Sequence, residues 1–220
     1  MQTKAVEDYL KAIYEVQERE GRVATSALAE RLQISAASAT GMIKKLAEMG
    51  LVSHEPYQGV RLTEPGRKIA LEVIRHHRLV ETYLVEAMGL TWDKVHDEAE
   101  KWEHVLSEEL EDRMDEMLGR PTHDPHGAPI PTREGHIPET PRLKLSEAVA
   151  GETVTIAQVA DDDAAMLRYL GERGLYPGVA VTVTHIEPFE GPLTVRREDR
   201  DISLGRPVAE CIKVRRPGEA

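Results

Sequence analysis

The fold of the N-terminal part of the chain is decided by residues 35–50, which read SAASATGMIKKLAEMG. Apolar residues recur there at intervals of three and four, the spacing that places side chains on one face of a helix. We therefore predict a helix that ends near Gly50, since glycine readily adopts the left-handed conformation found at helix ends. Its expected inner face consists of Ala39, Met42, Ile43, Leu46 and Met49.

Helix and strand patterns continue on both sides of this stretch. Upstream, the periodic apolar residues of 6–14 predict a longer helix, and residues 28–32 belong to a short second helix. Downstream, residues 51–55 and 60–63 alternate between apolar and polar, as strands do, around a turn at 57–59. Three helices followed by a hairpin are the pattern of a winged helix-turn-helix.

The polar side of residues 35–50 suits contact with DNA. In a helix-turn-helix, the start of the second helix enters the major groove. Small and hydroxyl side chains there allow close approach to base edges, while helix N–H groups and a lysine can hold phosphates. Modules that do not bind DNA also contain three such helices, and the added wing is what favours DNA. The candidate DNA-contacting residues are Ser35, Ala37, Ser38, Thr40, Gly41, Lys45, Tyr57 and Arg61.

The charge of the chain is distributed unevenly. The 220 residues carry a formal charge of −11, which by itself argues against nucleic acid as a partner. Residues 1–70, however, hold ten basic and nine acidic residues, whereas residues 71–140 hold seven basic and seventeen acidic ones. Because phosphate neutralisation supplies much of the affinity for DNA, one domain of net charge +1 binds weakly, and we expect two copies on one palindrome.

Composition also excludes several classes of protein. The single cysteine, Cys211, rules out an internal disulfide and a Cys-x-x-Cys zinc site. No run approaches the roughly 18 apolar residues that a membrane span needs, and the N-terminus has no signal-like apolar core. We expect a cytoplasmic protein with no membrane partner.

The acidic centre contains the stretch HDEAEKWEH at residues 96–104. On a helix, His96, Glu100, Glu103 and His104 would fall on one face. Carboxylates crowded in this way repel one another when empty, and a divalent cation relieves the repulsion. The alternative is an ordinary solvated helix surface.

A second pair of candidate ligands, His77 and Glu81, lies one helical turn apart on the preceding helix. Oxygen and nitrogen ligands without a thiolate favour Mn²⁺ or Fe²⁺ over structural zinc. The signature His-Glu-x-x-His is absent, and no nucleophile–base pair has convincing spacing. An enzyme with a small-molecule substrate is therefore not expected. A metal-dependent hydrolase with an accessory winged helix and a metal-independent regulator remain the alternatives.

After the helical segment, the sequence pattern changes to a proline-rich stretch followed by short strands. Residues 119–141 contain six prolines and predict a linker or an irregular packed loop, in which His123, His126 and His136 are expected at the surface. Beyond it, short alternating strands and the helical stretch 163–173 predict a small β-barrel. The expected strands are 179–185, 193–196 and 211–215. The fold class is mainly α with a small β part, and the expected domains are 1–72, 73–140 and 141–220.

Taken together, these motifs resemble the diphtheria toxin repressor family of metal-activated regulators, in its manganese-responsive branch. The resemblance covers essentially the whole chain. It implies an N-terminal winged helix, a helical dimerisation domain and an SH3-like barrel similar to FeoA domains. The stretches that carry it are DYLKAIY at 8–14, HRLVE at 77–81, VHDEA at 95–99, WEHV at 102–105 and DPHGAPIP at 124–131.

The resemblance also implies two metal sites. By position, the regulatory site matches Asp8, Glu100, Glu103 and His104. The ancillary site matches His77, Glu81 and His96, with Gln158 and Asp161 of the barrel as candidates to complete it.

Four positions of this chain bear on how far the resemblance extends. Iron-responsive members have Met and Cys where Asp8 and Glu100 stand here, so Mn²⁺ is the expected cofactor and Fe²⁺ the alternative. Lys11 stands where compact manganese regulators have an acidic ligand, and Gly41 replaces a longer polar side chain.

These features lead to one expectation for function. We predict a homodimer that binds a pseudo-palindromic double-stranded operator and represses manganese or iron uptake genes. Its dimer surface is expected around residues 90–118. The apolar residues expected to form it are Val95, Trp102, Val105, Leu106 and Leu110.

Overall fold

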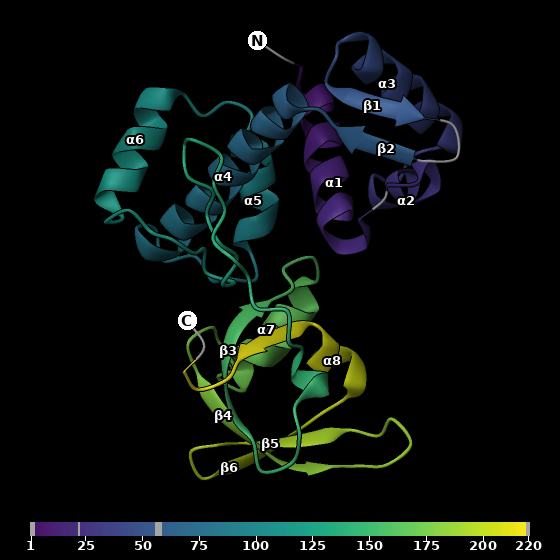
Figure 1. Cartoon of the computed structure of the whole chain (residues 1–220). Helices are drawn as coiled ribbons and strands as arrows, with labels where there is room; N and C mark the ends of the chain where they lie inside the picture. Colours follow the sequence, from purple (N-terminus) through teal and green to yellow (C-terminus); the bar gives the residue numbers. More distant parts are fainter. Residues whose placement is uncertain (1–2, 22, 56–58, 219–220) are drawn as a thin grey trace. The chain divides into compact units, whose positions relative to one another are not determined.

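The computed structural model describes residues 3–21, 23–55 and 59–218. These residues form two compact units, and most of their elements are labelled in Figure 1. The first unit contains Met1–His77, Trp102–Leu106 and Pro131–His136, and the second contains the remainder. The helix α4 (Glu64–Glu86) contributes residues to both units. The domain boundaries expected from the sequence stay predictions.

The first unit contains the predicted winged helix-turn-helix. Its strands pair antiparallel, with Val52 opposite Leu62. The three helices and the hairpin are thus confirmed in order and type. The elements before α4 are α1 (Lys4–Glu20), α2 (Thr25–Arg31), α3 (Ala36–Glu48), β1 (Val52–Glu55) and β2 (Gly59–Leu62).

The helix α3 begins at a side-chain cap and buries one apolar face. The hydroxyl of Ser35 accepts a hydrogen bond from the backbone N–H of Ser38, which satisfies one of the free donors of the first turn. Ile43 and Leu46 are buried in the core of this unit, as expected. Met49 is 45% exposed and does not belong to the inner face, because the helix has already ended at Glu48.

The helical segment after α4 departs from the sequence expectation. The helix α5 (Val95–Trp102) ends before Glu103, so Glu103 and His104 lie in a turn rather than on its face. Ser107 then caps a further helix, α6 (Glu108–Met117), through the backbone N–H of Leu110. Val95 is fully buried, so it is not part of an exposed apolar surface.

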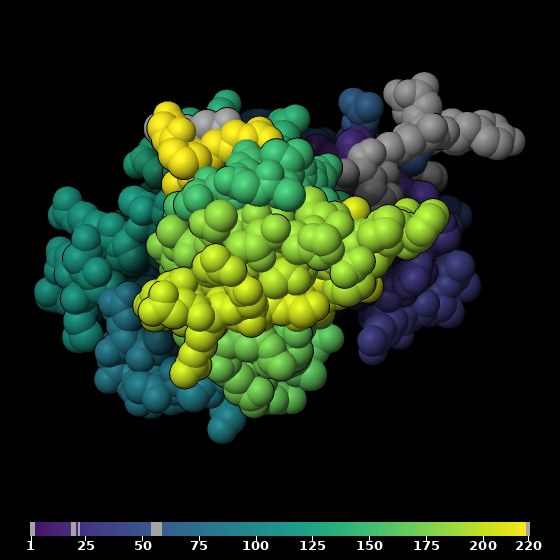
Figure 2. All heavy atoms as spheres, turned by 90° about the horizontal axis from the view of Figure 1, so that it is seen from below, coloured from purple at the N-terminus to yellow at the C-terminus, as the bar shows by residue number. Residues whose placement is uncertain are grey.

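The C-terminal residues of the second unit form a five-stranded antiparallel sheet in the order β6-β5-β4-β3-β7. Alternate residues of its strands, such as Val181 and Val183, are fully buried in one apolar core. The predicted barrel is confirmed, although two of its strands, β3 and β6, were not expected; its outer surface is yellow-green in Figure 2. The elements are η1 (Leu145–Glu147), β3 (Thr153–Val159), α7 (Ala164–Glu172), β4 (Ala180–Ile186), β5 (Leu193–Arg197), β6 (Arg200–Leu204), α8 (Arg206–Glu210) and β7 (Ile212–Arg215).

The proline-rich segment 119–141 has no regular helix or strand, but residues 126–131 in its middle are buried. His126 is 0% exposed, so the expectation of a surface position is wrong for this histidine. Within the described part of the chain, no helix is both long and apolar enough to cross a membrane.

Gly41 offers a test of how α3 is built. A Cβ at this exposed helical position would meet no atom within 4 Å. We expect Gly41→Ala to raise the free energy of unfolding by about 1 kcal/mol, because alanine has the higher helix propensity and nothing obstructs it. Urea denaturation followed by circular dichroism, with amide exchange of α3 as the local probe, measures the change.

Gly127→Ala serves as the opposite control. Gly127 has a φ of 85°, and a Cβ there would lie 2.0 Å from the carbonyl oxygen of Ala157. This variant should lose stability. A Gly41→Ala protein no more stable than the wild type would contradict the prediction for α3.

Candidate functional site

A first cluster of candidate ligands lies in the first unit, between α1 and the turn after α5. Asp8, Glu103 and His104 each offer one ligand atom, and these atoms all lie within 4.8 Å of one another. Nε2 of His104 is 2.8 Å from Oδ1 of Asp8 and 3.3 Å from Oε1 of Glu103. One imidazole nitrogen and two carboxylates in this arrangement can bind a divalent cation.

The orientation of His104 is set by a residue that the sequence reasoning missed. Nδ1 of His104 lies 2.6 Å from a carboxylate oxygen of Glu7, to which it can donate its proton. This hydrogen bond leaves Nε2 unprotonated and directed toward Asp8 and Glu103. Metal-binding histidines are commonly oriented in this way, by a carboxylate that accepts the proton of the other ring nitrogen. Among the described residues, the buried Nε2 makes no hydrogen bond, which fits a ligand nitrogen.

Glu103 is fully buried and is held by two further groups of the same unit. Nζ of Lys11 donates to both oxygens of its carboxylate, at 2.8 and 3.1 Å, and Nδ1 of His77 contacts the same carboxylate. Burial opposes ionisation, but the hydrogen bond from His77 and the charge of Lys11 outweigh it and lower the pKa of Glu103 to about 2. Glu103 is therefore a carboxylate at neutral pH.

The remaining predicted ligands on helices are divided between the units. His77 belongs to the first unit, whereas Glu81, His96 and Glu100 belong to the second. There, Nδ1 of His96 is 3.4 Å from Glu81, and Nε2 is 3.8 Å from Glu100. The placement of Glu100 in the regulatory site and of His77 in the ancillary site stay predictions.

A second cluster lies within the second unit and contains two residues that the sequence reasoning did not select. Glu81, Asp124, His126 and Asp161 offer ligand atoms that all lie within 4.8 Å of one another. Of the two barrel candidates, Asp161 belongs to this cluster, whereas the side-chain oxygen of Gln158 accepts a hydrogen bond from Lys213 at 3.0 Å. The signal for the missed pair was the stretch DPHG, in which short polar residues alternate with turn-forming ones.

Backbone contacts fix the missed pair in place. One carboxylate oxygen of Asp124 accepts hydrogen bonds from the backbone N–H groups of His126, at 2.8 Å, and Ala128, at 2.9 Å. Nε2 of His126 lies 2.8 Å from the carbonyl oxygen of Trp92 and can donate to it, which leaves Nδ1 for the cluster. Gly127 allows this loop to approach β3, because a Cβ there would collide with Ala157.

The electrostatics of the second cluster fit a missing positive charge. Burial, together with the nearby carboxylate of Glu81, raises the pKa of Asp124 to about 7. Burial disfavours the charged form of His126, but Glu81 outweighs it and raises the pKa of His126 to about 9. Among the described residues, Oδ2 of Asp124 and Nδ1 of His126 are buried without a hydrogen bond. A divalent cation bound there would replace the protons that these groups retain.

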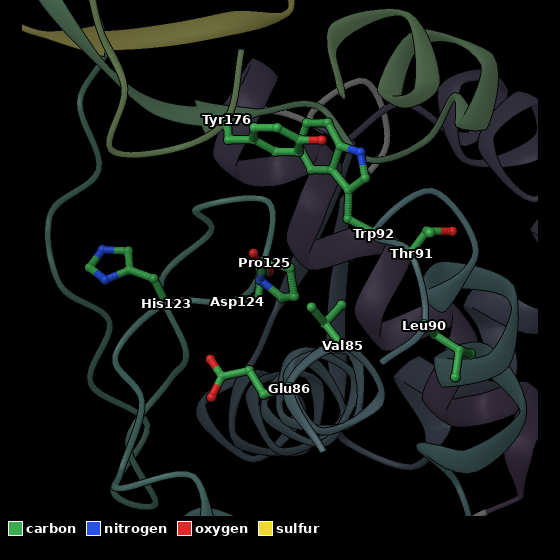
Figure 3. Close-up of a pocket in the computed structure, with 9 residues that line it drawn as sticks. All are labelled: Val85, Glu86, Leu90, Thr91, Trp92, His123, Asp124, Pro125 and Tyr176. Atoms are coloured by element: carbon green, nitrogen blue, oxygen red, sulfur yellow. The ribbon is translucent and has the colours of Figure 1, made fainter. Parts of the chain in front are cut away.

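An open pocket of about 400 Å³ adjoins this cluster in the second unit. Figure 3 shows Trp92 and Tyr176 on one side of it, with Glu86 and His123 on the other. The ring of Trp92 stacks on that of His126, with centroids 5.7 Å apart. Asp124, a residue of the second cluster, also lines this pocket.

The predicted DNA-contacting residues lie on the exposed side of α3 and on the wing. The hydroxyl of Thr40 donates to the carbonyl of Ala36 at 2.8 Å, so it is partly engaged within the helix. Tyr57 lies outside the described residues. The predicted residues that are exposed are Ser35, Ala37, Ser38, Thr40, Gly41, Lys45 and Arg61.

The pKa of Asp124 leads to a testable pH dependence. The folded protein keeps a proton on Asp124 up to about pH 7, whereas the unfolded chain releases it near the ordinary value of 3.8. The folded state therefore binds more protons in this range, and stability falls as the pH rises. Asp124→Asn removes this loss, so its melting temperature relative to the wild type should increase from pH 5 to pH 8. Calorimetry of the metal-free proteins measures the difference.

A matched control for this experiment is Asp162→Asn, which alters an exposed aspartate of the same unit. Its difference from the wild type should not change with pH. A difference for Asp124→Asn that stays constant or shrinks between pH 5 and pH 8 would show that Asp124 is ionised in the folded protein.

Family models match almost the entire chain. Residues 1–60 match the N-terminal DNA-binding domain of iron-dependent repressors. Residues 63–132 match the metal-binding and dimerisation domain of the same repressors, and residues 143–216 match the FeoA domain.

Individual relatives and solved structures agree with these matches. The iron-dependent repressor IdeR of Mycobacterium tuberculosis is 33% identical over 94% of this chain and 95% of its own. The diphtheria toxin repressor of Corynebacterium glutamicum is 31% identical over 94% of each chain. A manganese-dependent transcriptional repressor, solved in complex with manganese, has 42% identity and a TM-score of 0.89 over 96% of this chain and 99% of its own. Similarity of this extent places the chain in the diphtheria toxin repressor family of metal-dependent, DNA-binding transcriptional repressors.

Proposed function

We propose that this protein is a homodimeric repressor that Mn²⁺ activates for binding to a pseudo-palindromic operator of metal-uptake genes. The observation that carries the proposal is the grouping of Asp8 with Glu103 and His104. Asp8 lies on the first helix of the winged domain, and the other two residues lie in the turn after α5. A cation held by these three residues would join the DNA-binding helices to the metal-binding segment.

The helix α1 can transmit this attachment to the rest of the winged domain. Its residues Leu10 and Ile13 are fully buried, and α1 packs against α2 and β2. The side chain of Gln17 also accepts a hydrogen bond from the backbone N–H of Leu62 in the wing. Because packed elements move together, fixing Asp8 restricts the positions open to α3 and the wing.

The ligands determine which chemistry is available. The bound cation would supply the positive charge that Asp8 and Glu103 share, and Glu7 would hold the imidazole of His104 in the required orientation. Nothing in this arrangement requires turnover of a substrate, which favours a regulator over an enzyme.

The ligand types favour manganese by geometry rather than by affinity. Mn²⁺ stands at the weak end of the divalent series, so a site selects it through hard oxygen ligands and a high coordination number. Zn²⁺ favours four-coordinate sites and would leave Asp8 less engaged. The similarity to a repressor solved with manganese supports this choice. Fe²⁺ is the second candidate, because the matching family models and several relatives are iron-dependent repressors.

The proposed dimer rests on exposed apolar residues of the helical segment. In the first unit, Val105 is 75% exposed, and in the second unit, Leu110 and Met117 of α6 are 47% and 67% exposed. A symmetric dimer would place two reading helices on one operator and double the weak attraction that each winged domain has for phosphates.

Metal-dependent DNA binding is the direct test of the proposal. We expect the wild type to bind its own upstream DNA with Mn²⁺ and to lose binding with a chelator. Asp8→Ala should weaken the Mn²⁺-activated affinity at least about tenfold, because a lost ligand contact of this kind is worth more than 1.4 kcal/mol. Fluorescence anisotropy measures the affinity, and Fe²⁺ and Zn²⁺ are compared with Mn²⁺ under reducing, oxygen-free conditions.

Glu18→Ala is the matched control for Asp8→Ala, since Glu18 is an exposed acidic residue on the same helix. It should bind DNA as the wild type does. If a chelator leaves DNA binding by the wild type unchanged, the proposal is overturned. If Fe²⁺ activates binding fully and Mn²⁺ does not, iron is the activating metal instead of manganese.

The reading helix gives a second prediction. Lys45 is exposed on α3, and we assign it to phosphate contact rather than to a base. We expect Lys45→Ala to weaken binding to all DNA sequences alike and to reduce the salt slope by about one unit for each protomer bound. Ser38→Ala should instead weaken binding to the operator more than binding to random DNA. Equal losses on both DNAs would remove Ser38 from the residues that read bases.

A further inference from the structure

Lys11 is a buried lysine that contacts the first cluster from within α1. It is 7% exposed, and its Nζ lies 2.8 and 3.1 Å from the two carboxylate oxygens of Glu103. The same Nζ is 3.1 Å from Nδ1 of His77. A positively charged group of the protein thus already occupies one side of a proposed metal ligand.

Glu103 faces two positions for positive charge at once. Its Oε1 is 3.1 Å from Nζ of Lys11 and 3.3 Å from Nε2 of His104. Oδ1 of Asp8 lies 2.8 Å from the same Nε2 of His104, so a cation bound by Asp8 and His104 would share Oε1 with the ammonium. Two positive charges held a few ångströms apart in a buried site repel each other strongly.

Glu103 needs a positive partner even without metal. A fully buried carboxylate is costly unless it is paired and hydrogen-bonded. Lys11 provides that pairing. It lies one helical turn after Asp8, on the same face of α1. The contact therefore holds α1 to the turn that contains Glu103 in the absence of metal, and a metal must compete with it.

We infer that Lys11 is a built-in competitor of the activating metal, which holds Glu103 in the metal-free protein and weakens the binding of a divalent cation to Asp8, Glu103 and His104. This inference rests on the proposed function, because it assigns Lys11 a role at the proposed regulatory site. Lys11 thereby sets how much metal is needed for activation. If Lys11 had a purely structural role, the opposite result would be expected, since its loss would misplace Glu103 and weaken metal binding.

The test is a calorimetric titration of the full-length protein with Mn²⁺. Lys11→Met replaces the ammonium with an apolar side chain of similar length. We expect the binding step that involves Glu103 to become at least tenfold tighter, while the metal-free variant melts at a lower temperature than the wild type. The step is identified by Glu103→Gln, which should abolish it.

Lys101→Met is the matched control, because it removes an exposed lysine that lies 2.7 Å from Glu98. It also removes one lysine charge and should change the affinity for Mn²⁺ less than twofold. If Lys11→Met folds poorly, Lys11→Gln should also tighten binding, whereas Lys11→Arg, which keeps the charge, should retain the wild-type affinity.

The outcomes separate this inference from the proposed function. Unchanged or weaker binding of Mn²⁺ by Lys11→Met and Lys11→Gln would overturn the role of Lys11 as a competitor. If the wild type and Glu103→Gln titrate alike, the regulatory site itself is wrong, and the inference falls with it.

Discussion

The burial of one carboxylate, that of Glu103, is the constraint on which the first unit depends. Its side chain is fully excluded from solvent, so positive or proton-donating groups must surround it. Lys11 comes from the first helix and His77 from α4, and both contact the carboxylate. Segments far apart in the sequence are thereby tied to one point, which explains why the first helix of a DNA-binding domain packs beside a segment 90 residues later in the chain.

The two clusters are built in different ways. The residues around Glu103 come from separate elements, and their side chains depend on one another for position. In the second cluster, Asp124 and His126 are fixed by the backbone of their own loop and by the carbonyl of Trp92. The first arrangement can respond to what binds it, whereas the second is largely formed before binding.

The fold could be predicted from the sequence where a local pattern decides the structure. The period of residues 35–50 and the alternation in the barrel strands gave the winged helix and the C-terminal sheet. Patterns failed where tertiary contacts decide. Periodicity placed Glu103 and His104 on a helix face, but α5 ends at Trp102, and buried charge rather than helical spacing holds these side chains.

The candidate site shows the same division. The types of ligand were readable from the acidic, histidine-rich centre, but their grouping was not. Glu7 and His126 were missed because a lone acidic residue on a helix and a histidine in a proline-rich loop look like surface residues. Only the hydrogen bond that Glu7 accepts from His104 and the burial of His126 set them apart.

The stacking of Trp92 on His126 gives the protein an intrinsic optical label. The indole ring lies against the imidazole, with 22° between the ring planes, so any change of charge or ligation at His126 alters the surroundings of the chromophore. The sequence contains one other tryptophan, Trp102, and replacing it with phenylalanine would leave a single emitter. Occupancy of the loop-built cluster can therefore be followed by emission spectroscopy, separately from events at Glu103 and without attaching a dye.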